Sequence, residues 1–83
     1  MRSQNIIITG AASGIGKATA LLLGTQGVRL GLLDVDSPED VAAEIRRRGG
    51  TGIAYQCDVT SSTQVEETIR SFVNEFGLLT GKI

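Results

Sequence analysis

The sequence contains no histidine and only one cysteine. Without histidine, the common Cys/His zinc sites cannot be assembled and the most frequent general base near neutral pH is missing. A single cysteine cannot form an internal disulfide bond. We therefore expect neither a metal site nor a disulfide scaffold.

The chain also lacks a long apolar run and an excess of charge of one sign. Eight basic residues balance nine acidic ones, for a net charge of −1. This charge gives no field that would hold nucleic acid or an anionic membrane. No apolar stretch approaches the ~20 residues of a spanning helix, and the N-terminus has no secretory signal. We expect a cytoplasmic location, with neither nucleic acid nor membrane as a partner.

The length of 83 residues corresponds to one small domain, because typical domains have about 100–150 residues. A hydrophobic content of 41% is normal for a chain that folds. Eleven glycines are many for this length, and each carries an entropic cost unless its position needs positive φ or close backbone approach. The positions of the glycines should therefore be informative.

Apolar patterning divides the chain into alternating strands and helices. Short β-branched or apolar runs predict strands, and apolar residues at helical spacing predict helices. The expected strands cover residues 5–9, 28–33 and 52–57, and the expected helices run from 15 to Gly27, from 38 to 48 and from 62 to Gly77. This order predicts an α/β fold with right-handed crossovers and a parallel sheet in the strand order 3-2-1.

Two of the predicted helices carry signals for their first turn. Ser37 is a candidate N-cap followed by a proline and two acidic residues, and Ser61 with Gln64 has the spacing of a capping box. The helix after Ser61 has the clearest apolar stripe in the chain.

A glycine-rich turn connects the first strand to the first helix, with the sequence TGAASGIG at residues 9–16. Gly10 would permit the tight turn, Gly14 would let a pyrophosphate approach the backbone, and Gly16 would let the helix pack closely. The free amides of the helix N-terminus would face the anion. The alternative is that these glycines serve packing only.

Two acids end the next two strands at the same edge of the sheet. Asp34 comes 18 residues after Gly16, close to the ~20 expected of an acid that binds an adenosine ribose. Its alternative role is a turn aspartate, a role that Asp36 could fill. Asp58 could accept a hydrogen bond from an adenine amino group, or it could cap the turn before the next helix. A carboxylate at residue 34, with Ser13 rather than a basic residue before Gly14, favours NAD over NADP.

The glycine turn, the Leu-Leu-Asp34 strand end and the Cys-Asp58-Val59 strand end together resemble the N-terminal half of a short-chain dehydrogenase/reductase. This resemblance implies a Rossmann-like three-layer half-fold. It also implies that Ser13 and Ile15 contact the ribose and pyrophosphate, and that the Val59 backbone contacts the adenine ring. By the same likeness Asp34 binds the ribose and Asp58 the adenine amino group.

The family pattern continues with Asn-Asn-Ala-Gly on a fourth strand, a catalytic serine and a Tyr-x3-Lys pair, none of which occurs here. We therefore expect residues 1–77 to form a dinucleotide-binding half-domain, and residues 78–83 to be a divergent tail in a fold truncated before the fourth strand. The first strand would then keep an exposed edge. The expected function is the cofactor-binding part of an oxidoreductase without catalytic residues. The alternatives are an interaction module that pairs through the open edge and a fragment without its own function.

Overall fold

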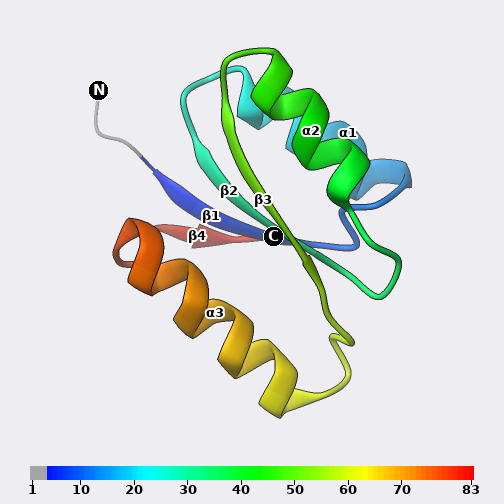
Figure 1. The fold of residues 1–83 in the computed structure, drawn as a ribbon, viewed down its shortest axis with the longest axis vertical. Helices are drawn as coiled ribbons and strands as arrows, with labels where there is room; N and C mark the ends of the chain where they lie inside the picture. The colour runs from blue at the N-terminus through cyan, green and yellow to red at the C-terminus, as the bar shows by residue number, and fades with distance from the viewer. Residues whose placement is uncertain (1–3) are drawn as a thin grey trace.

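The computed structural model describes residues 4–83, in which strands and helices alternate (Figure 1). Residues 1–3, part of the N-terminus in which we expect no secretory signal, lie outside this range. The elements are β1 (Asn5–Thr9), α1 (Gly14–Gly24), β2 (Arg29–Asp34), α2 (Glu39–Arg47), β3 (Thr51–Gln56), α3 (Ser62–Phe76) and β4 (Gly81–Lys82). All the strand pairs are parallel, in the order β3-β2-β1-β4. The predicted α/β class and the 3-2-1 order are confirmed.

The sheet is covered on both faces. Figure 1 shows α1 and α2 on one side of the sheet and α3 on the other. Side chains alternate across β1, so Ile6 and Ile8 join the α1/α2 core, whereas Ile7 joins the core under α3. Because the strand is buried on both faces, it needs a continuous apolar run, which is the pattern seen in the sequence.

Contact between α3 and the sheet is close at one point. Gly31 of β2 pairs with Ile7 of β1. A Cβ atom at Gly31 would lie 2.6 Å from Cδ1 of Ile7 and 3.0 Å from Cδ1 of Phe72 on α3. The glycine leaves the space into which the buried Phe72 ring packs.

Helix ends differ from the predicted ones by small amounts. Helix α1 ends at Gly24, and Gly27 lies in the following turn with φ of 77°. Helix α2 begins after Pro38, which takes the N-cap position without a side-chain hydrogen bond, so the Ser37 cap was wrong. The Ser61 cap is confirmed, because its Oγ accepts the amide of Gln64 at 3.3 Å.

The last residues of the chain form a short strand, which corrects two expectations. Strand β4 pairs with β1, Gly81 opposite Ile6 and Lys82 opposite Ile7. The amide of Ile83 donates to the Ile7 carbonyl at 2.8 Å. The fold is therefore not truncated before a fourth strand, and the β1 edge is covered by residues 81–83. A two-residue strand is too short to show a period in the sequence.

Asn5 holds the chain reversal that leads into β4. Its buried side chain donates from Nδ2 to the carbonyl oxygens of Phe76 and Leu78, both at 3.0 Å. Its Oδ1 accepts a hydrogen bond from Nε of Arg29 at 2.7 Å, and the Arg29 guanidinium lies 5.7 Å from the centre of the Phe76 ring. These contacts fix the end of α3 relative to β1 and β2.

Within residues 4–83, no helix has the length and apolar character needed to cross a membrane.

Candidate functional site

The predicted site residues lie where β1, β2 and β3 end. The glycine turn follows β1, Asp34 is the last residue of β2, and Asp58 follows β3. The amide of Cys57 donates to the Asp34 carbonyl oxygen at 2.8 Å, which joins the ends of β2 and β3. Ligands of open α/β sheets bind at this carboxyl edge.

The three glycines of the turn have different roles. Gly10 and Gly14 have φ of 65° and 60°, a conformation that side chains with Cβ rarely adopt. Gly16 has no positive φ, but a Cβ there would lie 2.0 Å from the Gly10 carbonyl oxygen. Gly16 therefore lets the first turn of α1 pack directly on the start of the loop.

The N-terminus of α1 offers backbone donors on an open side. The amide of Lys17 donates to the Ser13 carbonyl at 3.2 Å. The amides of Gly14, Ile15 and Gly16 precede that bond and have no carbonyl within the helix to bond to. A Cβ at Gly14 would meet no other atom within 4 Å, and Ile15 is 87% exposed. A helix N-terminus of this kind favours an anion through its amides and its dipole.

Asp34 connects this loop to the sheet. Its Oδ2 atom accepts the amide of Ala12 at 3.0 Å, and its Oδ1 atom accepts the amide of Asp36 at 3.1 Å. The adjacent amide of Ala11 donates to the Leu33 carbonyl at 3.2 Å. Asp34 thus makes the turn after β2, which is the alternative to a ribose contact, and it also contacts the glycine loop.

Asp58 makes the turn before α3. Its Oδ1 atom accepts the hydroxyl of Thr60 at 2.6 Å and the amide of Thr60 at 2.9 Å. These bonds, the hydroxyl first, lower the pKa of Asp58 below its ordinary value. Its amide donates to Oε1 of Gln64 at 2.9 Å. The Gln64 side chain therefore reaches Asp58 rather than closing the capping box with Ser61.

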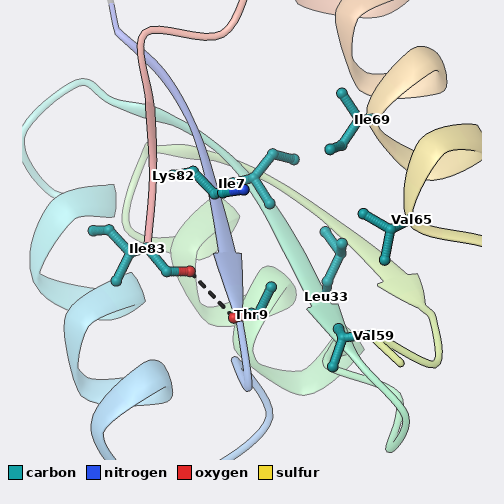
Figure 2. Close-up of a pocket in the computed structure, with 8 residues that line it drawn as sticks. All are labelled: Ile7, Thr9, Leu33, Val59, Val65, Ile69, Lys82 and Ile83. Atoms are coloured by element: carbon teal, nitrogen blue, oxygen red, sulfur yellow. Dashed lines mark hydrogen bonds between the residues drawn. The ribbon is translucent and has the colours of Figure 1, made fainter. Parts of the chain in front are cut away.

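A cavity of about 330 Å³ lies beside these strand ends, on the α3 face of the sheet (Figure 2). Its lining consists of Ile7, Thr9, Leu33, Val59, Val65, Ile69, Lys82 and Ile83. Figure 2 shows the side chains of Ile7 on β1, Leu33 on β2, and Val65 and Ile69 on α3 around one space, with the Ile83 side chain turned away from it. Residues 82–83 reach this cavity only through the pairing of β4 with β1, which leaves no local pattern in the sequence.

Parallel strands, helices on both faces and a glycine turn at the first helix define a Rossmann-like nucleotide-binding unit. A family model described as "short chain dehydrogenase" matches residues 4–81. The chain therefore belongs to the short chain dehydrogenase family, as the sequence resemblance predicts.

Individual relatives agree with this assignment. The cyclohexanol dehydrogenase of a Rhodococcus species is 32% identical over 93 residues, which cover 95% of this chain and 34% of that protein. The solved structure of a hydroxysteroid dehydrogenase from Escherichia coli has a TM-score of 0.91 at 30% identity, covering 95% of this chain and 34% of that one. A putative D-mannonate oxidoreductase from Haemophilus influenza, solved with bound NAD, has a TM-score of 0.90 at 28% identity, with coverages of 95% and 29%. The chain spans about a third of the length of these three relatives.

Proposed function

We propose that this chain is the NAD-binding part of a short-chain dehydrogenase-like oxidoreductase. The amides of Gly14, Ile15 and Gly16 bind the pyrophosphate, with Gly10 shaping the turn and the Ser13 hydroxyl near the ribose. The observation that carries the proposal is the hydrogen bond between Asp34 and the loop amide of Ala12, because it puts an acid suited to ribose hydroxyls beside an anion site.

The adenine end is assigned to the turn after β3. Asp58 accepts the adenine amino group, and the backbone of Val59 contacts the ring. Both residues are exposed, and Val59 also lines the cavity with Thr9. The Oδ2 atom of Asp58 accepts no hydrogen bond from any residue in 4–83, so a ligand donor can reach it while Oδ1 keeps its bonds to Thr60.

The preference for NAD over NADP follows from charge. A 2′-phosphate would lie against the Asp34 carboxylate, with Asp36 exposed two residues away. Ser13, rather than a basic residue, precedes Gly14. The relative solved with NAD supports dinucleotide binding in the family without deciding between the two cofactors.

These 83 residues do not carry the family's catalytic groups. The one tyrosine, Tyr55, is followed four residues later by Val59 rather than lysine, and Asn-Asn-Ala-Gly does not occur. Bound NAD would supply a hydride acceptor, but nothing here matches the tyrosine and lysine that exchange the proton. We expect no dehydrogenase turnover by the purified chain, and measurable NAD reduction with alcohols would contradict this.

Titration calorimetry tests the binding proposal. Wild-type protein should bind NADH more tightly than NADPH, and Asp34→Ala should weaken NADH binding at least about tenfold, the effect of losing hydrogen bonds to a charged acceptor. Asp40→Ala is the control, because Asp40 is an exposed acid in the first turn of α2. The proposal fails if wild-type protein gives no heat with millimolar NADH, or if both variants bind alike.

A second candidate function is association through the β4 side of the sheet. Strand β4 is the edge strand of the sheet formed by residues 4–83, and Leu78 and Ile83 beside it are 81% and 55% exposed. An unpaired strand edge with exposed apolar side chains beside it favours pairing with another chain. Size-exclusion chromatography of the chain, alone and with a full-length relative, distinguishes this candidate. A chain that stays monomeric alone and does not bind the full-length relative would exclude association through this edge.

A further inference from the structure

Two amides of the glycine turn are already used inside the protein. The amide of Ala11 donates to the Leu33 carbonyl, and the amide of Ala12 donates to the Asp34 carboxylate. Both bonds attach the middle of the loop to the end of β2. The amides available to an anion include those of the first turn of α1, from Gly14 onward.

The two attachments differ in kind. The Ala11 bond ends on a backbone carbonyl that any residue at position 33 would supply. The Ala12 bond ends on a side chain, so it depends on the residue at position 34. The Ala12 hydrogen bond lies between Gly10 and Gly14, whose positive φ values give the loop two sharp bends. Because this bond fixes a point between the two bends, it fixes the direction of the backbone amides that follow.

The Asp34 carboxylate has room for a ligand while it holds the loop. A carboxylate offers about four lone-pair positions. The amides of Ala12 and Asp36 use one position on each oxygen. Within residues 4–83, one position on each oxygen remains, which is enough for two ribose hydroxyls without release of Ala12.

We propose that Asp34 is a positioning residue for the phosphate subsite, separately from its contact with ribose. By holding the Ala12 amide, it sets the orientation in which the first amides of α1 meet a phosphate. This inference rests on the proposed nucleotide function and assigns one of its acids a second task.

The inference makes a prediction that a ribose contact alone does not. A nucleotide without 2′ and 3′ hydroxyls offers Asp34 no ribose donor, so a residue that only binds ribose would be irrelevant to it. Removing a negative charge near the site should by itself strengthen the binding of an anion. The lost charge alone would therefore raise the affinity of the Asp34→Ala protein for such a ligand. A lowered affinity would instead indicate the loss of the positioning bond.

The experiment compares ADP with 2′,3′-dideoxy-ADP as probes by calorimetry. We expect Asp34→Ala to bind dideoxy-ADP about five- to tenfold more weakly than wild type, the effect of one lost charge-assisted hydrogen bond. Asp34→Asn keeps one acceptor oxygen for Ala12 and should recover most of this loss. Asp36→Ala keeps its amide and removes only a nearby charge, so it should bind dideoxy-ADP as well as wild type or better.

Amide hydrogen exchange in the ligand-free protein gives a second readout. The Ala12 amide should exchange faster in Asp34→Ala, whereas the Ala11 amide should stay protected by the Leu33 carbonyl. This measurement also shows whether the variant is folded, and Asp34→Ser, which also lacks the carboxylate, takes its place if Asp34→Ala is not.

The outcomes separate the inference from the proposed function. If wild-type protein binds ADP but Asp34→Ala binds dideoxy-ADP as tightly as wild type, the positioning role is wrong and the nucleotide site stands. If wild type binds neither nucleotide, both the proposed function and the positioning role of Asp34 are wrong.

Discussion

Substitution of Gly16 by alanine tests the packing of the glycine loop. A Cβ at residue 16 would lie 2.0 Å from the carbonyl oxygen of Gly10, 2.7 Å from its carbonyl carbon and 3.2 Å from the Thr9 oxygen. These are backbone atoms, so no side-chain rotation relieves the contact. The loop or the helix must move as a whole.

The size of the effect follows from two opposing contributions. Alanine is favoured over glycine within a helix by about 1 kcal/mol, which alone would stabilise the variant. Overpacking costs about 1–3 kcal/mol, and a contact with backbone belongs at the upper end. We expect a net loss of about 2 kcal/mol for Gly16→Ala, a large part of the roughly 4–12 kcal/mol available to a chain of this length.

Gly14→Ala is the matched comparison, because both glycines lie in the first turn of α1. Residue 14 has open space around its Cβ position but φ of 60°, so the cost is the left-handed conformation, about 1 kcal/mol. Urea unfolding followed by circular dichroism measures the free energy of unfolding of both variants. An unchanged dependence of this free energy on urea concentration would show that both variants unfold in the same transition as wild type. The reasoning is refuted if Gly16→Ala is as stable as wild type or more stable than Gly14→Ala.

Two further predictions concern residues outside the loop. Asn5→Ala should lower the free energy of unfolding by about 2–3 kcal/mol, because the carbonyl oxygens of Phe76 and Leu78 and Nε of Arg29 lose their hydrogen bonds to its side chain. Gln4→Ala, at an exposed position, should change it little. Equal stability of both variants in urea would contradict the role of Asn5. Thr60→Val removes the hydroxyl that contributes most to the lowered pKa of Asp58, so carbon NMR should find that pKa raised toward its usual value of about 4. Since the folded pKa is below the unfolded one, the contribution of this group is present at neutral pH and is lost as the pH falls below about 4. An Asp58 pKa that is the same in both proteins would refute the assignment.

The sequence predicted the loop well because its constraints are local. The spacing of Gly10, Gly14 and Gly16 reflects two positive φ values and one close approach, and each disfavours residues other than glycine at that position. The burial of β1 on both faces likewise requires a continuous apolar run. Patterns of this kind are visible without knowledge of the rest of the fold.

Other features depend on pairing between distant residues and leave no local pattern. Strand β4 has two residues, and it forms because the β1 backbone offers free hydrogen-bonding groups after the chain has turned at Gly77. The turn itself is fixed by Asn5, 71 residues away from Phe76 in sequence. A lone asparagine before an apolar strand carries no such information.

The two acids show a further limit. Sequence spacing placed Asp34 and Asp58 at the correct edge of the sheet, but it treated a structural and a ligand role as alternatives. Among residues 4–83, each carboxylate makes local hydrogen bonds and keeps acceptor positions that no other described residue uses. One residue can therefore serve both roles, which a choice between them does not anticipate.

The most direct test of dinucleotide binding is a titration of the ¹⁵N-labelled protein with NAD, followed by the backbone amide resonances. Binding at the proposed site predicts shifts at residues 13–16, 34–36 and 58–59, with little change at the opposite end of the sheet around residues 48–51. No shifts at millimolar NAD, or shifts confined to other surfaces, would contradict it.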